Sequence, residues 1–351
     1  MAAPIFIGVL TLEKHVNGVW MTNLIDEIES LTSNSKISFN VEIIELDSLE
    51  INLHEKPRWN LLINRVSDAA DPFYAKACLS VLNTFKIWNI PCFNGPACYS
   101  IGCSKYLHHV VFTRSGLPSP KSTMVKNINK DNLLRSVKIL EEEFGCSWPF
   151  LIKPNSAGFG IGIKLFSKFE DFNFFCESHT SIEDNDAIQS INISNDNILL
   201  IQEYIKPLNN EIYRIWFLDG RVQCGLKRLV AVDASNDITF TNQCVGSVCS
   251  LPKSKIKNIN KNKNSAWNVP LDVAREIENI VRHAGEDCHA GSVEFLYDKE
   301  GKRFYFDLNM LSTLPCLQSV ENKEDIWPED FNPWKELAQS VLNKIPCSNS
   351  H

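Results

Sequence analysis

Residues whose types and spacing could bind an anion lie between positions 150 and 166. There Lys153 precedes a loop with Gly158, Gly160 and Gly162, and apolar, β-prone runs flank the loop. Glycines at this spacing let backbone N–H groups approach an anion closely, and the Lys153 ammonium would add a point charge. The segment predicts a β-hairpin whose loop covers phosphates, with a simple tight turn as the alternative. It is neither a P-loop nor a dinucleotide fingerprint, because a strand follows the glycines where those motifs have a helix.

A second group of chemically capable side chains lies near the C-terminal end of the chain. Glu294 falls within an apolar run at 291–297, and Asp307 and Asn309 fall within another at 303–309. Pairing of the two runs brings Glu294 close to Asp307, and the period of two places Asp307 and Asn309 on one face. Three oxygen ligands so arranged suit Mg²⁺. Two surface carboxylates are the alternative, although acids in such an apolar hairpin need a compensating charge.

An apolar run at 198–205 ends in three polar residues, Gln202, Glu203 and Tyr204. A buried strand that turns polar needs partners for those groups. The amino edge of an adenine ring is one candidate partner.

Two arginines, Arg214 and Arg228, lie on or beside the strands of a hairpin that the Asp-Gly pair at 219–220 predicts. An isolated arginine on a strand usually lies at the surface, whereas two arginines facing one cleft would clamp phosphate. His108 and His109 are adjacent on a predicted helix and point to different faces. We therefore expect one at the core edge and one at the surface, and not paired ligands.

The chain of 351 residues is 44% hydrophobic and 22% charged, with a formal net charge of −7. This composition is that of a globular protein with two or three cores. The negative charge disfavours a broad nucleic-acid surface. Neither a membrane-spanning apolar run nor a signal-peptide pattern is found, so a cytoplasmic protein is expected. The 12 cysteines show no Cys-x-x-Cys, which favours reduced, buried thiols, and the basic segment 253–264 predicts a solvated loop.

The elements that would position these groups begin with an alternation of strands and helices. The order of strand, helix, strand, strand and helix before residue 98 is typical of a doubly wound α/β layer. Asn64 and Arg65 follow its third strand, where open α/β sheets bind ligands, with a solvated loop as the alternative. Further along, Asp131 is expected to cap a helix at 132–144.

In chain order these parts resemble the ATP-grasp superfamily, and more closely its RimK-type carboxylate–amine ligases, over nearly the whole chain. The matching parts are the α/β layer, a lysine that opens a helix, the Lys-Pro strand with its glycine loop, Gln-Glu-Tyr, a strand arginine and the carboxylate hairpin. The resemblance implies an α/β (α+β) ATP-grasp fold with a Rossmann-like pre-ATP-grasp domain at 1–98. It places an N-lobe with a glycine-rich lid at 99–197 and a C-lobe with the magnesium site at 198–351.

The resemblance also implies roles for single residues. Positions that hold ATP in the family match Lys105, Lys153, Gly158, Gly160, Gln202, Glu203, Tyr204, Glu211 (with a slip of one residue) and Asn242. Positions that hold Mg²⁺ or Mn²⁺ match Glu294, Asp307 and Asn309. The catalytic basic positions near the acyl and phosphate groups match Arg214 and Arg228.

Several positions depart from the pattern of the family. Phe240 stands where an arginine is frequent, and Val245-Gly246 replaces a glycine pair. Asp307 is shorter than the usual acid, and Met-Leu-Ser-Thr-Leu-Pro follows Asn309 in place of a run of small residues. ATP binding is still expected, and the substrate class is left open.

The function that the resemblance implies is an ADP-forming ligase that uses ATP and Mg²⁺ to join a carboxylate to the amine of an amino acid or peptide through an acyl phosphate. One alternative is a small-molecule kinase like the inositol-phosphate kinases, which use a similar Asp-x-Asn metal strand. Another is a nucleotide-binding protein without turnover, which Phe240 would suit. Neither nucleic acid nor membrane is expected as a partner. The family often pairs, so a homo-oligomer stays open.

Overall fold

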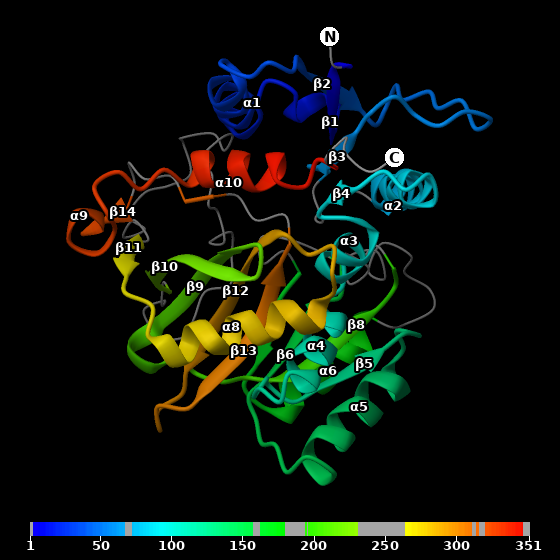
Figure 1. Ribbon diagram of the computed structural model, residues 1–351. Coiled ribbons are helices and arrows are strands. Elements are labelled where there is room, and N and C mark those ends of the chain that lie inside the picture. Colours follow the sequence, from blue (N-terminus) through cyan, green and yellow to red (C-terminus); the bar gives the residue numbers. More distant parts are fainter. Residues whose placement is uncertain are drawn as a thin grey trace, which may run out of the picture.

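The structure is a computed structural model, which describes residues 3–66, 72–156, 162–179, 194, 196–230, 264–310, 314–315 and 320–346. Within these residues the chain forms three β-sheets, two of four strands and one of six, with helices packed against them (Figure 1). The first sheet is parallel and the other two are mainly antiparallel. The mixed α/β fold class predicted from the sequence is confirmed.

The N-terminal layer is built on the parallel sheet, in the order β2-β1-β3-β4. Its elements are β1 (Ile5–Thr11), the short 3-10 helix Glu13–His15, α1 (Val19–Thr32), β2 (Phe39–Glu45), β3 (Leu61–Asn64), α2 (Pro72–Ile87), β4 (Cys92–Phe93) and α3 (Pro96–Gly102). Leu61, Leu62 and Ile63 of β3 are all buried, as expected for a strand that is covered on both faces. The predicted doubly wound order is confirmed.

The second sheet has the order β5-β8-β6-β7. Its region contains α4 (Lys105–Arg114), β5 (Ser122–Val125), α5 (Lys130–Glu142), β6 (Phe150–Pro154), β7 (Lys164–Phe166), α6 (Phe169–His179) and β8 (Leu199–Glu203). Phe150 and Ile152 pack with Leu133 of α5 and Phe172 of α6, so one face of the sheet is buried under the two helices. β6 and β7 pair antiparallel, which confirms the predicted hairpin.

The cap of α5 differs from the prediction. The helix begins at Lys130 and not at Asn132, and the side chain of Asn129, not Asp131, accepts the hydrogen bond from the backbone N–H of Asn132. Asn and Asp are similar N-cap residues, so composition alone does not decide between neighbouring candidates.

The third sheet has the order β13-β12-β9-β10-β11-β14. Its region contains the 3-10 helix Leu208–Asn210, β9 (Glu211–Leu218), β10 (Arg221–Leu229), β11 (Asn264–Trp267), α8 (Leu271–Ala284), β12 (Ala290–Tyr297), β13 (Arg303–Asn309), β14 (Val320–Glu321) and α9 (Lys323–Ile326). Both predicted hairpins are confirmed, since β9 pairs with β10 and β12 with β13. Asp219 and Gly220 turn the first hairpin with positive φ angles of 47° and 75°.

The last described helix, α10 (Pro333–Leu342), returns to the N-terminal layer and packs against α1 (Figure 1). Its residues Leu337 and Val341 share a buried cluster with Leu24 and Ile28 of α1. Asp219, in the β9–β10 turn, accepts a hydrogen bond from Ser340 of α10. The C-terminal helix therefore ties the N-terminal layer to the third sheet.

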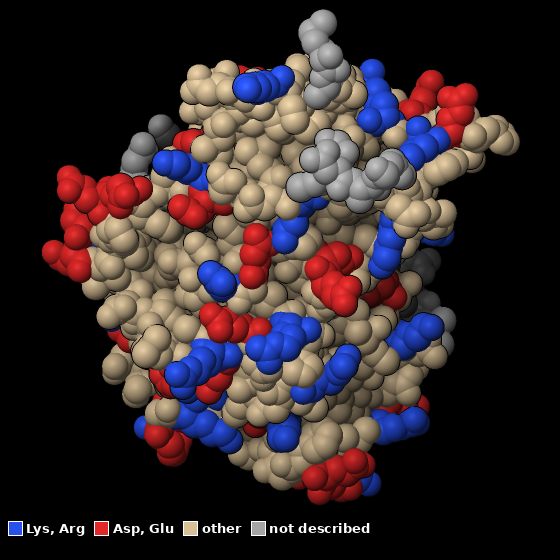
Figure 2. Space-filling model, viewed as in Figure 1, with Lys and Arg blue, Asp and Glu red and all other residues tan. Residues whose placement is uncertain are grey.

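Basic and acidic side chains alternate over the face shown in Figure 2. This face is therefore not uniformly basic. The eight cysteines in the described part of the chain are all free thiols. None of the helices described has the length and apolar character that a membrane span requires.

Candidate active site

Charged side chains lie side by side across the third sheet. Glu294 on β12 pairs with Arg214 on β9 and with Asp307 on β13. Residues directly opposite on antiparallel strands share a face, so the three side chains project on the same side. Asn309 lies two residues beyond Asp307, and Arg228 lies two residues beyond the partner of Arg214 on β10, so both belong to this face. The structure thus brings together five residues that were predicted to act in one site.

The other face of this sheet carries the apolar cluster that fixes the strands. Tyr213 and Phe295 stack there with ring centroids 5.1 Å apart, and they share a buried cluster with Ile277 and Ile280 of α8. α8 contributes to this cluster because its apolar residues recur at helical spacing. The charged residues therefore point away from the core that holds their strands.

Glu294 is a buried acid with an arginine beside it. Its exposed fraction is 3%, and Arg214 Nη1 lies 3.4 Å from its Oε1. Arg214 Nε also donates to Ser292 Oγ at 2.9 Å, which holds the guanidinium in place. Burial raises the pKa of the Glu294 carboxyl above its ordinary value, and the charges of Arg214 and Arg228 oppose that rise. A buried carboxylate in such surroundings favours an additional cation.

Asp307 is held by one group on α4 and one on its own strand. Its Oδ1 lies 3.1 Å from His108 Nδ1 on α4, and its Oδ2 accepts a hydrogen bond from Asn309 Nδ2 at 3.3 Å. Burial opposes ionisation of Asp307, but the hydrogen bond with His108 and the charges of Lys105 and Lys153 outweigh burial and lower its pKa. The Asp307 carboxyl is therefore ionised, and its oxygens could serve as ligands for a cation.

Lys153 faces the carboxylates from the second sheet. It is 6% exposed and shares a face of that sheet with Gln202, opposite to the face that α5 and α6 cover. Its Nζ lies 5.8 Å from the centre of the Phe306 ring, next to Asp307 on β13. Its positive charge favours ionisation of both Glu294 and Asp307. The two sheets therefore present their charged residues to each other.

Asn155 connects the two lysines, and the sequence analysis did not find it. It lies just after β6, is 1% exposed, and accepts a hydrogen bond from Tyr106 N at 2.9 Å in the first turn of α4. Its backbone carbonyl accepts another from Lys105 N at 3.1 Å, and its side chain also bonds to Ser104. Asn155 thus caps α4 from another element and fixes Lys105 relative to Lys153. The only signal in the sequence is that Asn155 follows the Lys-Pro pair.

Gln202 and Glu203 point to opposite faces of the second sheet, because they are neighbours on β8. Gln202 is 1% exposed, and its Oε1 has no hydrogen-bond partner among the described residues. Glu203 accepts hydrogen bonds from Lys121 N at 2.6 Å and from Cys146 Sγ at 3.5 Å. Of the two, Gln202 lies on the face of Lys153, while the Glu203 carboxylate is engaged at the helix-covered face and Tyr204 follows at the strand end.

Glu211 and Arg228 complete the described candidates. Glu211 lies on the face of β9 that carries Tyr213, whose hydroxyl donates to it at 2.8 Å, and it forms an ion pair with Lys227 at 3.0 Å. Arg228 is 8% exposed, donates from Nε to Asn264 Oδ1 at 3.1 Å, and has a buried Nη1 without a partner in the described part of the chain. The structure therefore brings Arg228, but not Glu211, to the face of Glu294. Gly158, Gly160 and Asn242 lie outside the described residues.

The chemistry of these side chains fits a polyanion together with a divalent cation. Three oxygen-bearing side chains, two of them carboxylates, lie on neighbouring strands, and such ligands suit Mg²⁺ when phosphates and water complete the shell. The cations around them exceed the carboxylates by four to two, which leaves a local surplus of positive charge. The groups counted are Lys105, Lys153, Arg214 and Arg228 against Glu294 and Asp307.

Comparison with known proteins gives matches of structure only. No model of a protein family matches the sequence, and no curated protein matches it. D-cycloserine synthetase DcsG is 11% identical over 97% of this chain and 100% of its own, with a TM-score of 0.63. D-alanyl-alanine synthetase A from Vibrio cholerae O1 biovar eltor str. N16961 is 11% identical over 98% of this chain and 99% of its own, with a TM-score of 0.63.

A third similar structure is the ATP-grasp ligase PsnB, complexed with minimal precursor, Mg and ADP. It is 11% identical over 97% of each chain, with a TM-score of 0.59. The similarity extends to several kinds of ligase, so the RimK-type branch stays a prediction. Over nearly its full length, this chain has the ATP-grasp fold.

Proposed function

We propose that the protein is an ATP-dependent, ADP-forming ligase that joins a carboxylate to an amine. The observation that carries the proposal is the position of Lys153, whose Nζ lies 5.8 Å from the Phe306 ring, beside Asp307. A phosphate-binding lysine from one sheet and metal-binding carboxylates from the other would then share one triphosphate. The full-length fold similarity to three ligases supports the same function.

The nucleotide is assigned to the facing sides of the two sheets. Lys105 and Lys153 neutralise its phosphates, and the buried amide of Gln202 is available to the adenine edge. Glu203, Tyr204, Glu211, Gly158, Gly160 and Asn242 remain nucleotide-binding candidates on sequence grounds. The predicted division at residues 98/99 and 197/198 is likewise part of the proposal.

The metal site is assigned to Glu294, Asp307 and Asn309. When bound there, Mg²⁺ or Mn²⁺ would offset the negative charge of the β- and γ-phosphates. Burial raises the pKa of the Glu294 carboxyl, and a bound divalent cation would favour its ionised form, which supports this assignment.

Arg214 and Arg228 are assigned to the reacting groups. A substrate carboxylate oxygen attacks the γ-phosphorus, the bond to the β-phosphate oxygen breaks, and ADP leaves. An amine then attacks the acyl carbon, and inorganic phosphate leaves while the amine loses a proton. The two guanidiniums stabilise the charge that develops on the phosphoryl and acyl oxygens, so catalysis rests on positioning and electrostatics.

The test is ADP release from the purified chain with a panel of amino acids and peptides. We expect ADP only when a carboxylic acid and an amine are both present, and transfer of ¹⁸O from a labelled carboxylate to phosphate. Lys153→Ala should abolish the activity, whereas Lys138→Ala, an exposed lysine on α5 that is paired with Glu142 at 3.6 Å, should not. Turnover with an alcohol acceptor alone would point to a kinase. ATP binding without ADP formation in any mixture would point to a nucleotide-binding protein without turnover.

A further inference from the structure

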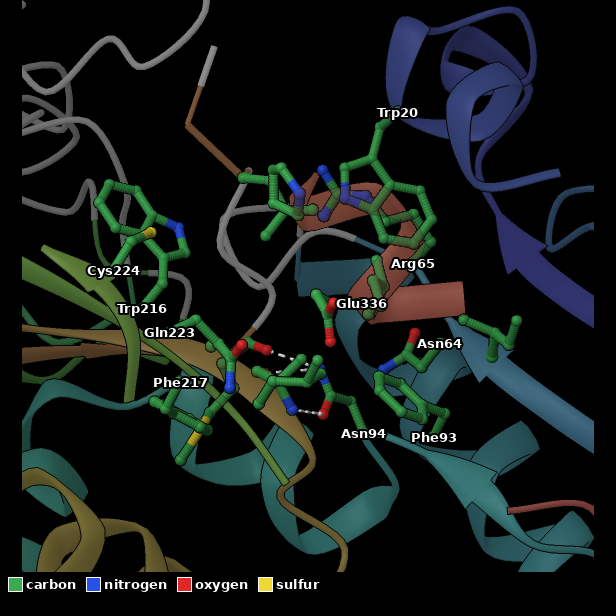
Figure 3. A pocket seen from close by; sticks show the side chains of 18 of the residues that line it. Trp20, Asn64, Arg65, Phe93, Asn94, Trp216, Phe217, Gln223, Cys224 and Glu336 are labelled. Carbon is green, nitrogen blue, oxygen red and sulfur yellow. Dashed lines mark hydrogen bonds between the residues drawn. The ribbon is translucent and has the colours of Figure 1, made fainter. Parts of the chain in front are cut away.

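A pocket lies where the N-terminal layer, the third sheet and α10 meet (Figure 3). The space between its lining residues is about 620 Å³ when the open solvent at its mouth is included. Asn64 and Arg65 come to it from the carboxyl end of β3, where the sequence had suggested ligand binding. A pocket therefore lies at the carboxyl end of β3.

Hydrogen-bond donors gather on the N-terminal side of the pocket. Asn64 is 2% exposed, and its Oδ1 accepts from Val66 N at 3.1 Å, while its Nδ2 has no partner among the described residues. Trp20 Nε1 is likewise a buried donor without a partner there. The Arg65 guanidinium lies 4.6 Å from the Trp20 ring centre and adds a positive charge. Buried donors of this kind suit a carboxylate.

The rest of the pocket differs in character. Phe93, Trp216 and Phe217 contribute apolar walls, and Glu336 of α10 contributes an exposed carboxylate (Figure 3). A ligand that complements the buried donors, the Glu336 carboxylate and the apolar walls has a carboxylate, a positively charged amine and a large apolar body. A free amino acid with a bulky apolar side chain has this combination of groups.

We propose that this pocket binds the amine substrate of the ligase as a free amino acid with a large apolar side chain. Its carboxylate meets Asn64, Trp20 and Arg65, and its amine meets Glu336. The inference rests on the proposed function for the role of the ligand, and on the pocket for its chemistry.

The position of the pocket indicates that the amine of the bound amino acid, and not its carboxylate, is the reacting group. Trp216 lines the pocket and also lies 5.3 Å from the Arg214 guanidinium, which belongs to the proposed reaction site. Gly291 and Met310 line it too, and they adjoin Ser292 and Asn309 of that site. The carboxylate is anchored on the N-terminal layer, away from the phosphate-binding lysines, so it is not the group to be phosphorylated.

The pocket is tested by calorimetric titration of the full chain without nucleotide. The probes are each enantiomer of phenylalanine, alanine, N-acetylphenylalanine and phenethylamine. We expect one enantiomer of phenylalanine to bind. Phenethylamine, which lacks the carboxylate, should bind about ten-fold more weakly or worse. N-acetylphenylalanine should lose at most about five-fold, because Glu336 is exposed and its ion pair is screened. Alanine should bind more weakly than phenylalanine because it leaves the apolar walls unfilled.

Two variants test whether the binding differences among these probes arise from Arg65 and Glu336. Arg65→Met should weaken phenylalanine binding, by less than the loss of the whole carboxylate in phenethylamine does, because Asn64 and Trp20 remain. It should leave phenethylamine binding unchanged, which also shows that the variant is folded. Glu336→Gln should weaken phenylalanine and phenethylamine but not N-acetylphenylalanine. Equal binding of phenylalanine and phenethylamine, or no effect of either variant, would overturn the inference. If the expected pattern is found but no acid yields ADP, the ligase proposal fails while the pocket assignment stands.

Discussion

Replacing Asn155 with alanine tests how the two phosphate-facing lysines are held together. Asn155 accepts from Tyr106 N at 2.9 Å, bonds to the buried Ser104 hydroxyl, and follows Lys153 by two residues. Loss of a helix cap costs about 1 kcal/mol, and a buried hydroxyl left unsatisfied costs about 1–3 kcal/mol. We therefore expect Asn155→Ala to destabilise the protein by about 2–4 kcal/mol.

The same change should weaken ATP binding. Asn155 fixes the N-terminus of α4, so Lys105 would lose its fixed position relative to Lys153, and we expect the Kd for ATP to rise about ten-fold. Urea unfolding followed by tryptophan fluorescence, and calorimetric titration with ATP and Mg²⁺, measure the two effects.

Asn129→Ala is the matched control. Asn129 caps α5 through the same kind of bond, to Asn132 N at 2.9 Å, but it is exposed. The Asn129→Ala change should lower the free energy of unfolding by about 1 kcal/mol and leave ATP binding unchanged. If Asn155→Ala were no more destabilising than Asn129→Ala, or bound ATP like the natural protein, the positioning role of Asn155 would be wrong.

Two further predictions concern the strands and turn near the pocket. A Cβ at Gly291 would lie 2.7 Å from the Asn309 carbonyl oxygen, so Gly291→Ala should cost about 1–3 kcal/mol and weaken Mg²⁺-dependent ATP binding; unchanged titrations would contradict this. Burial opposes ionisation of Asp219, but bonds from His289, Ser340 and Lys344 lower its pKa to about 2. It therefore stabilises the fold above pH 4 and less so as the pH falls toward 2. Asp219→Asn should flatten acid unfolding in that window; an unchanged acid midpoint would count against it.

Local sequence patterns predicted the contacts in the site between residues that lie close together in the chain. The β12–β13 hairpin followed from period-two alternation around a short turn, so the pairing of Glu294 with Asp307 could be predicted. The pairing of Glu294 with Arg214 joins strands 80 positions apart, and no local pattern specifies that register.

Long-range packing explains what the sequence analysis missed or predicted wrongly. Asn155 acts on a helix about 50 residues away, and α10 reaches α1 across most of the chain, so neither contact leaves a local signal. The expectation of a surface position for one of the adjacent histidines is wrong. His108 is buried against Asp307, and His109 Nδ1 is buried with its pKa lowered to about 3 by burial, because α4 packs against β13.

A double-mutant cycle in ATP affinity tests most directly whether the two sheets share one triphosphate site. Lys153→Met and Asp307→Asn are made singly and together, and the Kd for ATP is measured with and without Mg²⁺. If both residues act on the same Mg²⁺–triphosphate, each change weakens binding with Mg²⁺, and the combined loss departs from the sum by about 0.5 kcal/mol or more. The account would be contradicted if the two single losses of binding free energy add up to the combined loss within about 0.3 kcal/mol. It would also be contradicted if ATP binding by Asp307→Asn still depended on Mg²⁺.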